Sequence, residues 1–311
     1  MRFSAELENR LKKRFRHLAR WAEREGTTAF RAYDRDLPQA PWQIDWYAGK
    51  VAATEVVTSA ARRLDEDERA AEQAEVVLAV TRALGVAEGD VFVKSRARRL
   101  SGQQHEKLAH KKSEVIVEEH GLRLVANLSD YLDTGVFLDH RPLRRRVGKL
   151  AGGKRVLNLF CYTGAFTVHA AAAGASETVG VDLSNTYLAW AEKNLALNDL
   201  AAPNHRFVRE DALSFLAERS AKYDVIVCDP PTMSRSKSAA DFDVQRDHVR
   251  LVRLCAERLS PGGVLFFSTN ARKFVLDPAA VAGLVAKDIT AETIPEDFRA
   301  DAHKAWEIAR Q

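Results

Sequence analysis

The sequence has few cysteines and no long apolar segment. Cys161, Cys228 and Cys255 are scattered, with no Cys-x-x-Cys pair and no histidine at metal-ligand spacing. This pattern excludes disulfides and a structural zinc site, fits a reducing cytosol, and leads us to expect no bound metal. The charged N-terminus lacks the apolar core of a signal peptide, and no run reaches the roughly 18 apolar residues of a membrane span. We therefore expect a cytoplasmic protein with no membrane partner.

Glycine is scarce where a dinucleotide-binding protein would need it. The segment LFCYTGAF, residues 159–166, follows an apolar run and opens an expected helix, yet it holds one glycine, Gly164. Dinucleotide sites need closely spaced glycines there, because backbone amides must approach a pyrophosphate. S-adenosylmethionine has no phosphate and does not need them. The loop therefore favours the methyl donor over a nicotinamide cofactor.

The length and the local patterns predict two domains. The 311 residues are 46% hydrophobic and 29% charged, an ordinary globular composition. Residues 1–140 read as an α+β domain, with helices over 5–25 and 61–85 and antiparallel strands between and after them. From residue 154 short apolar strands alternate with helices, which predicts an α/β domain over 141–311 with a doubly wound, Rossmann-like parallel sheet.

Polar residues follow the ends of the expected parallel strands, where doubly wound sheets bind ligands. In chain order these strand ends are Gly164, Asp182, Glu210-Asp211, Asp229-Pro230-Pro231 and Ser268-Thr269-Asn270. A carboxylate at Asp182 can accept two ribose hydroxyls, and one at Asp211 can reach the adenine amino group. The alternative is that both acids only cap the helices that follow them.

The corner Asp229-Pro230-Pro231 is stiff for local reasons. The first proline keeps Asp229 out of the helical region, and both prolines fix φ and lack a backbone donor. We therefore predict that Asp229 is a rigid acceptor that receives the edge of a nucleobase. A plain proline turn is the simpler alternative.

Basic residues are clustered, although the net charge is only +4. Seven lie between Lys94 and Lys112 against one acid, and seven between Arg141 and Arg155 with none. Such clusters suit a phosphate backbone, although a solvated helix face and a basic loop would look the same. The residues we expect to contact RNA are Arg96, Arg98, Arg99, Lys111, Lys112, Arg144, Arg145, Arg235 and Lys237.

Several strings extend over nearly the whole chain and carry a family resemblance. They are ENRLKKRFRHLARWAEREG, NLSDYLDTGVFLDHR, LNLFCYTGAFTVHA, VDLSNTYLAWAEKNLALN, DPPTMSRSK and FDVQRDH. Together they resemble the C-terminal half of the bifunctional bacterial large-subunit ribosomal RNA methyltransferases, here free-standing. The resemblance implies a seven-stranded methyltransferase sheet, an N-terminal domain that orients RNA, and methyl transfer from S-adenosylmethionine to N7 of a guanine. The implied partner is 23S rRNA or a large-subunit assembly intermediate; the oligomeric state stays open, a monomer included.

The resemblance also implies roles for individual residues. Asp229, Pro230 and Pro231 would flank the transferred methyl, with Asp229 positioning the guanine rather than removing a proton. The implied cofactor contacts are Asp139, Arg141, Asn158, Phe160, Tyr162, Thr163, Gly164, Ala165, Asp182, Leu183, Asp211, Ala212 and Asp229. Met233 departs from the family, whose members tend to have an aromatic residue there. Tyr131, Phe137, Tyr162 and Phe242 are the other candidates for stacking on the base.

Three competing functions remain. A C5-cytosine methyltransferase needs a cysteine nucleophile, which its members carry after the fifth strand; here that strand ends in FFSTN. An N2-guanine or N6-adenine methyltransferase favours an aromatic residue after Asp-Pro-Pro, where this chain has Thr232. A ribosome-assembly factor could bind RNA without catalysis, but it would not need the four strand-end residues together.

Overall fold

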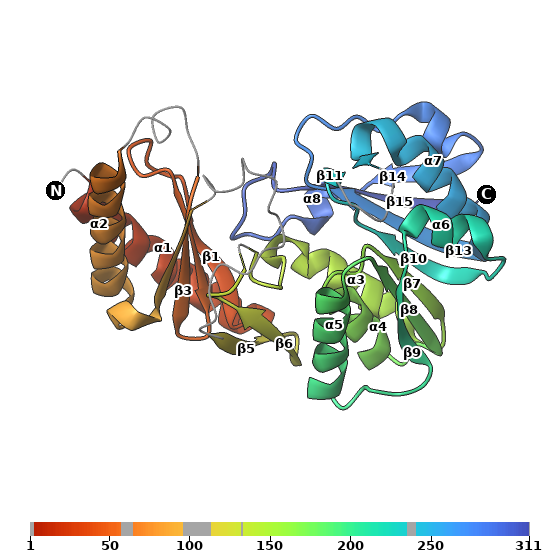
Figure 1. The fold of residues 1–311 in the computed structure, drawn as a ribbon, viewed down its shortest axis with the longest axis horizontal. Helices are drawn as coiled ribbons and strands as arrows, with labels where there is room; N and C mark the ends of the chain where they lie inside the picture. Colours follow the sequence, from red (N-terminus) through yellow and green to blue (C-terminus); the bar gives the residue numbers. More distant parts are fainter. Residues whose placement is uncertain (1–2, 57–64, 96–112, 132, 235–240, 311) are drawn as a thin grey trace. The chain divides into compact units, whose positions relative to one another are not determined.

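The structure is a computed structural model that describes residues 3–56, 65–95, 113–131, 133–234 and 241–310. The chain forms two compact units, Met1–Leu138 and Asp139–Gln311 (Figure 1). The second unit begins two residues before the boundary expected from the sequence, so Asp139 and His140 belong to it.

The first unit combines two long helices with a four-stranded sheet and a separate hairpin. The helices are α1 (Ser4–Glu25) and α2 (Glu66–Leu84), with the short 3-10 helix η2 (Glu88–Asp90). The sheet order is β1 (Ala29–Asp34), β2 (Trp42–Tyr47), β3 (Lys50–Glu55) and β4 (Val91–Ser95). The hairpin consists of β5 (Glu114–Glu119) and β6 (Leu122–Asn127).

Local sequence explains most of this unit. Leu7, Leu11 and Leu18 recur at helical spacing on α1 and are buried in the core. Asp65 and Glu68 form a capping box that starts α2. The expectation of antiparallel strands was incomplete: β4 pairs with β3 in parallel, because α2 lies between them and makes the crossover that a parallel pair requires.

The second unit contains a seven-stranded, mostly parallel sheet, as the sequence predicts. Its order is β14-β15-β13-β10-β7-β8-β9, and β13, β10, β7, β8 and β9 are parallel. The two remaining strands run antiparallel to their neighbours. The strands are β7 (Arg155–Leu159), β8 (Glu177–Asp182), β9 (His205–Arg209), β10 (Tyr223–Cys228), β13 (Leu259–Thr269), β14 (Leu284–Asp288) and β15 (Lys304–Arg310).

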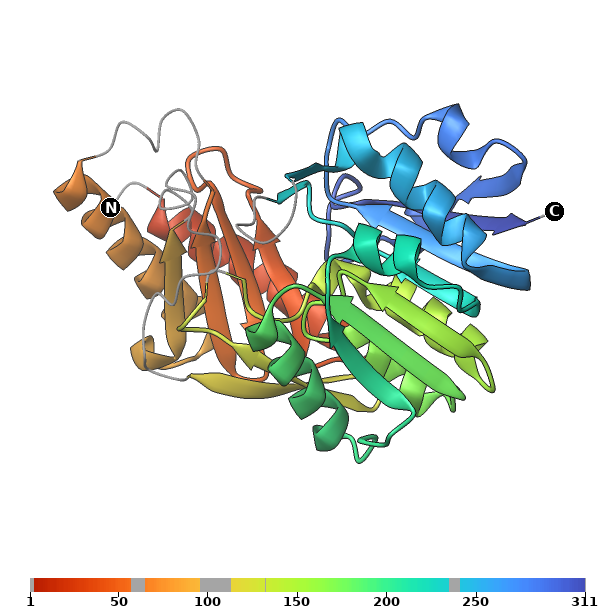
Figure 2. The ribbon, with the colours of Figure 1, turned by 45° about the vertical axis from the view of Figure 1, so that its right-hand side comes forward.

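Helices join these strands and cover both faces of the sheet (Figure 2). They are α3 (Arg141–Ala151), α4 (Ala165–Ala172), α5 (Asn185–Leu197), α6 (Ala212–Glu218), α7 (Val244–Glu257) and α8 (Thr290–Thr293). The shorter elements are the 3-10 helices η4 (Leu138–His140) and η5 (Pro278–Val281) and the strand pair β11 (Met233–Ser234) and β12 (Phe242–Asp243).

Strand alternation divides the core of this unit into two layers. Val225 and Val227 of β10 pack in the cluster that contains α3 and α4, whereas Ile226 and Cys228 pack in the cluster that contains α6 and α7. Successive side chains of a strand point to opposite faces, so a central strand needs apolar residues at every position. The order of the strands reverses at β7: β8 and β9 follow on one side of it, and β10 lies on its other side. This switch point brings the end of β10 next to the loop after β7.

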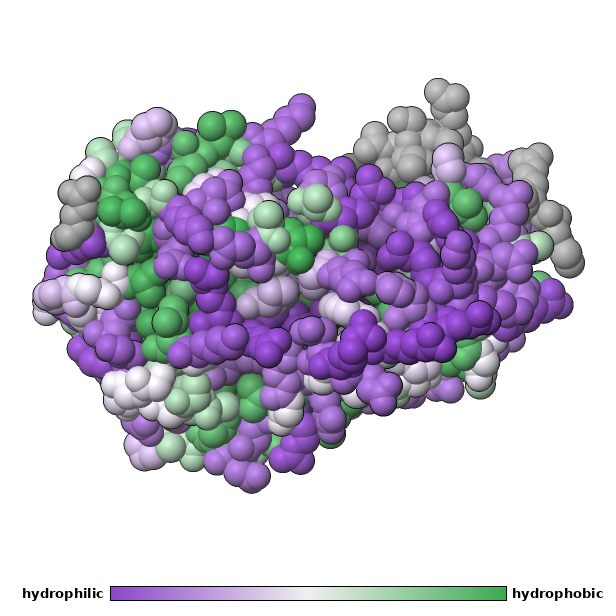
Figure 3. Space-filling view, turned by 180° about the vertical axis from the view of Figure 1, so that it is seen from behind, coloured by the Kyte–Doolittle hydropathy of each residue, from purple (hydrophilic) through white to green (hydrophobic). Residues whose placement is uncertain are grey.

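The exposed surface is mixed. On the face drawn in Figure 3, hydrophilic side chains predominate and apolar patches lie between them. In the described part of the chain, no helix is both long enough and apolar enough to span a bilayer.

Candidate active site

The loop after β7 has a tightly defined backbone. Phe160 and Tyr162 have positive φ angles of 53° and 51°, and Gly164 has a φ of 73°. A Cβ added to Gly164 would lie 2.7 Å from the Cβ of Ala191 on α5. The single glycine therefore has two reasons to be there, its left-handed backbone and the close approach of a second helix.

Asp182, at the end of β8, supports this loop. Its Oδ2 accepts a hydrogen bond from the backbone amide of Tyr162 at 3.0 Å, and its Oδ1 accepts one from the amide of Ser184 at 2.9 Å. A carboxylate offers about four acceptor sites, so these two backbone contacts do not preclude a hydrogen bond to a ligand. The geometry leaves Asp182 suited to ribose hydroxyls; sequence reasoning predicted that role without foreseeing the backbone contacts.

Some of the other predicted cofactor residues in this region make hydrogen bonds within the protein. The buried Asn158 amide donates to the hydroxyl of Thr167, and Asn194 donates to the carbonyl of Thr163. Leu183 follows Asp182 and is partly exposed, whereas Ala165 begins α4. These contacts fix the loop's course; direct contact with a cofactor stays a prediction for each of them.

Asp211 caps helix α6. Its Oδ1 accepts from the backbone amide of Ser214 at 2.9 Å and from that residue's hydroxyl at 3.2 Å, while the neighbouring Ala212 is buried. The capping alternative raised by the sequence is therefore present in the structure. It does not exclude an adenine contact, because one carboxylate oxygen has no part in the cap.

The Asp-Pro-Pro corner is held on both sides. Ser268, on β13, donates a hydrogen bond to Oδ1 of Asp229 at 2.7 Å, and Nε2 of His140 lies 3.2 Å from Oδ2. Beyond the prolines, the hydroxyl of Thr232 donates to the side-chain oxygen of Asn270 at 2.8 Å. The strand end Ser268-Thr269-Asn270 thus fixes the corner from the neighbouring strand.

The charges around Asp229 keep it ionised. Burial raises the pKa of this carboxyl, but the positive charge and hydrogen bond of His140 and the hydroxyl of Ser268 outweigh it, so the pKa lies below the ordinary 3.8. Burial lowers the pKa of His140, and the carboxylates of Asp229 and Asp139 outweigh that effect and raise it above 6.5. Asp229 is therefore a hydrogen-bond acceptor and a weak base at neutral pH.

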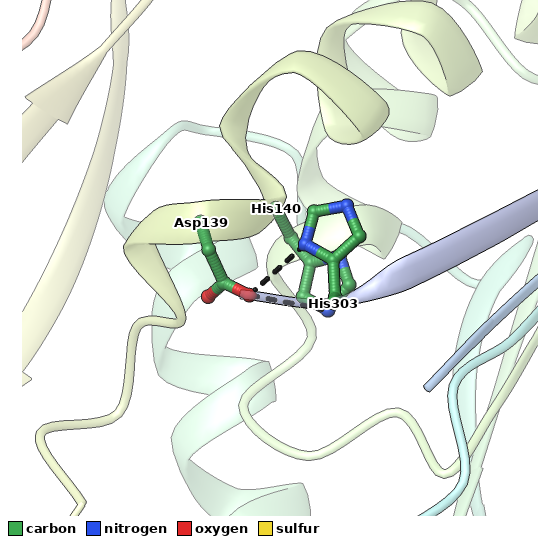
Figure 4. A group of neighbouring side chains, drawn as sticks. All are labelled: Asp139, His140 and His303. Carbon is green, nitrogen blue, oxygen red and sulfur yellow. Dashed lines mark hydrogen bonds and ion pairs between the residues drawn. The ribbon is translucent and has the colours of Figure 1, made fainter. Parts of the chain in front are cut away.

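Asp139, His140 and His303 form a cluster beside this corner (Figure 4). The two imidazole rings stack with centroids 4.5 Å apart and planes 17° apart. Nδ1 of His303 lies 3.1 Å from the Asp139 carboxylate, and its Nε2 lies 3.0 Å from the Thr293 hydroxyl.

This cluster has the spacing of a metal site, since its ligand atoms lie within 4.8 Å of one another. Two observations favour a hydrogen-bonded cluster instead. Both nitrogens of His303 already have partners, and stacked rings direct their in-plane lone pairs in parallel rather than toward one point. The expectation of no metal stays a prediction.

The basic residues of α3 differ in exposure. Arg141 is buried and pairs with Asp297 at 3.2 Å, so in this structure it holds the chain before β15; its predicted cofactor contact stays a prediction. Arg144 is also buried, with its guanidinium over the ring of Phe166, so in this structure it packs in the interior; its expected RNA contact stays a prediction. Arg145 is exposed.

The remaining expected RNA contacts lie outside the described residues. They are Arg96, Arg98, Arg99, Lys111, Lys112, Arg235 and Lys237.

The candidate stacking residues have different environments. Phe242 is buried and packs against Phe160, with ring centroids 5.7 Å apart, so it is part of the core. Tyr162 packs edge-on against Tyr187. Met233 and Phe137 are 51% and 40% exposed, which leaves them accessible to a ligand.

A cavity of about 460 Å³ adjoins the strand pair that continues from the Asp-Pro-Pro corner. It is lined by Met233, Ser234, Asp241, Phe242, Asp243, Gln245 and Arg246. The lining includes most of the FDVQRDH segment. Sequence analysis identified this segment as part of the family resemblance but assigned it no role in the site.

Sequence reasoning missed His140 and Ser268 as partners of Asp229. His140 lies inside the quoted string FLDHR, but the contacts had been assigned to its neighbours Asp139 and Arg141. Ser268 had been noted only as a strand end. The available signal was the polar strand end beside Asp-Pro-Pro, because adjacent parallel strands bring their carboxyl ends together.

The fold and the strand-end residues define a doubly wound protein with a ligand site at the switch point. The family model of the S-adenosylmethionine-dependent methyltransferases matches residues 30–296. The chain belongs to this family, and S-adenosylmethionine is its cofactor.

The curated relatives include two proteins named ribosomal RNA large subunit methyltransferase K/L. The one from Ectopseudomonas mendocina is 46% identical over 96% of this chain and 41% of its own length. The one from Hahella chejuensis is 46% identical over 96% of this chain and 42% of its own length. The chain thus spans about two fifths of the length of these relatives. Our expectation that it corresponds to one half of such a protein was therefore wrong, and the part of the relatives that it matches stays a prediction.

Two solved structures share the fold. SMU.776, a candidate methyltransferase complexed with SAH, matches with a TM-score of 0.79 at 24% identity, covering 98% of this chain and 81% of that one. The SAM-dependent methyltransferase from Agrobacterium tumefaciens matches with a TM-score of 0.62 at 19% identity, covering 86% and 87%. At these identities the likeness concerns the fold alone.

Proposed function

We propose that this methyltransferase transfers the methyl group of S-adenosylmethionine to N7 of a guanine in large-subunit ribosomal RNA. The RNA class is supported by the names of the relatives at 46% identity, which are large-subunit ribosomal RNA methyltransferases. The clustered basic residues of the sequence support a nucleic-acid partner. The cytoplasm is the location we propose with it.

The observation that carries the choice of atom is the state of Asp229. N7 of guanine has an in-plane lone pair that is available at neutral pH, so its methylation needs no base. A carboxylate with a lowered pKa, fixed by Ser268 and His140, is a poor base and a good acceptor. We assign it the task of accepting a hydrogen bond from N1 or N2 of the guanine and directing N7 toward the methyl group.

Positioning is enough to account for a large part of the rate. Orientation of two reactants can contribute about 7–11 kcal/mol, whereas extruding a base costs a few kcal/mol. We assign the cavity beside Met233 to the extruded nucleotide. Asp182 and Asp211 then hold the ribose and the adenine of the cofactor, and residues 158–164 surround its methionine part.

The C5-cytosine alternative finds less support in the cysteines. That reaction needs a thiolate that attacks C6 of the base. All three cysteines are buried, and burial raises the pKa of Cys161 and of Cys228 well above the ordinary value. A buried thiol with a raised pKa is a poor nucleophile.

The role of Asp229 is tested with an Asp229→Asn variant. The amide keeps one acceptor oxygen but loses the charge, and a charge-assisted hydrogen bond is about twice as strong as a neutral one. We expect single-turnover methylation at saturating cofactor to slow roughly tenfold or more. Full activity in this variant would remove Asp229 from the proposed mechanism.

The base is tested in cells. Nucleosides of 23S rRNA are compared by mass spectrometry between cells with and without the gene. Loss of 7-methylguanosine supports the proposal, and loss of 5-methylcytidine or N2-methylguanosine contradicts it. If no nucleoside changes and calorimetry detects no S-adenosylmethionine binding, the non-catalytic assembly factor is favoured instead.

A further inference from the structure

His140 is more deeply buried than the carboxylate beside it, which is half-buried. The His140 side chain is 4% exposed, whereas that of Asp229 is 23% exposed. A substrate can therefore touch Asp229 but not His140. Whatever His140 contributes to the reaction must pass through Asp229, 3.2 Å away.

Several elements converge on the His140 ring. Asp229 follows β10, Asp139 lies next to it on η4, and His303 precedes β15. Arg144 of α3 is the positive group whose charge opposes that of His140, and Phe166 of α4 packs at 5.9 Å between ring centroids. Two carboxylates against one guanidinium favour a positive charge on the ring.

Of the two stacked imidazole rings, His140 and His303, we expect only one to be protonated. Burial and the positive charge of His140 lower the pKa of His303, although its hydrogen bond to Asp139 opposes them. In a neutral His303 that donates from Nδ1 to Asp139, Nε2 is an acceptor that faces the Thr293 hydroxyl. The single proton of this hydroxyl also lies within reach of the carbonyls of Ile289 and Thr290. His140 is then the imidazolium and His303 the neutral ring that supports it.

We propose that His140 is a positioning residue for methyl transfer: as an imidazolium it fixes the Asp229 carboxylate, together with Ser268, in the ionised orientation that receives the target base. The stacked ring of His303 and the Asp139 carboxylate, 4.0 Å from Nε2 of His140, flank the His140 ring in turn (Figure 4). This inference rests on the proposed role of Asp229 as an acceptor, but not on the identity of the base.

Deprotonation of His140 has a definite consequence. As the pH rises through its raised pKa, the ring loses its charge and its attraction for the carboxylate. The methylation rate should therefore be highest while His140 is protonated and fall on the alkaline side of 6.5. Asp229 titrates below 3.8, so it contributes only an acid limb at much lower pH.

The test is a pH profile of single-turnover methylation of 23S rRNA at saturating S-adenosylmethionine. In His140→Gln, whose amide can still donate to Asp229 but has no charge, we expect a rate about 10- to 100-fold lower and no alkaline limb assignable to His140. In Asp139→Asn, which removes a carboxylate that raises the pKa of His140, the limb should move to lower pH. His205→Gln, at the amino-terminal end of β9 and thus away from the carboxyl ends of the strands, should keep the wild-type profile.

Two results would overturn the proposal. One is a folded His140→Gln protein with the wild-type rate and pH profile. The other comes from NMR titration of the imidazole: if Asp229→Asn leaves the pKa of His140 unchanged, the two groups are not coupled. These results are independent of whether guanine is the target nucleobase. That assignment is checked separately, because mass spectrometry identifies the methylated nucleoside in the same reactions.

Discussion

Gly164 is the residue of the loop after β7 that tolerates replacement least. Its φ of 73° disfavours any side chain, and α5 leaves no room for a Cβ. Asp182 ties the same loop through the amide of Tyr162. The position of the expected methionine-binding backbone is thus set by a few contacts, each of which a single substitution can remove.

Gly164→Ala should cost about 2–4 kcal/mol of unfolding free energy and weaken cofactor binding. About 1 kcal/mol comes from the left-handed backbone and the rest from the 2.7 Å overlap with Ala191. Gly153→Ala is the matched control, since Gly153 has a φ of 70° and no atom near the added Cβ. Urea unfolding and calorimetry measure both; equal losses in the two variants would show that the close approach is unimportant.

At the level of elements, the acids at the strand ends have a structural role beside the ligand role that we propose for them. Asp211 caps α6 with one oxygen, and Asp182 fixes the loop after β7 through the amide of Tyr162. The sequence alone therefore does not distinguish an acid that caps a helix from one that binds a ligand. The two roles can be separated because a cap needs an acceptor, whereas the proposed adenine contact also uses the charge.

Asp211→Asn should separate them. Asparagine caps helices about as well as aspartate, so the unfolding free energy should change by less than ~0.5 kcal/mol. Affinity for S-adenosylmethionine should fall about tenfold, because a charge-assisted hydrogen bond to the adenine amino group is weakened. Asp65→Asn, the same change at the cap of α2, is the control and should leave affinity unaltered. Unaltered affinity in both would leave Asp211 a cap only.

The parallel strands and their helices were predictable because each is a local pattern: an apolar run, a polar strand end, a helical period. Strand β1 escaped prediction, and so did β14 and β15 with their antiparallel pairing. Such pairing is fixed by neighbours distant in the chain. The contact between His140 and Asp229 also joins residues distant in the chain. The sequence therefore identified the segments that contain the two residues, but it did not predict that they are in contact.

The whole chain consists of two units with separate cores. The candidate cofactor residues, from Asp139 to Asp229, all belong to the second. A ligand that binds the folded form of one unit stabilises that unit by mass action, by about 2.7 kcal/mol at a concentration 100 times its Kd.

S-adenosylhomocysteine should therefore raise the unfolding temperature of the second unit. By hydrogen exchange with mass spectrometry, added protection is expected at the ends of β7, β8 and β10, with little change in the α1 and α2 helices. Equal protection of both units would show that they unfold as one, and protection confined to the first would contradict the assigned cofactor site.

The most direct test of the proposed reaction uses the purified chain, 23S rRNA and S-adenosylmethionine with an isotopically labelled methyl group. After digestion of the RNA, the labelled nucleoside is identified by mass spectrometry. Label in 7-methylguanosine is the predicted result. Label in 5-methylcytidine or N2-methylguanosine, or no label in the RNA despite bound cofactor, would contradict it.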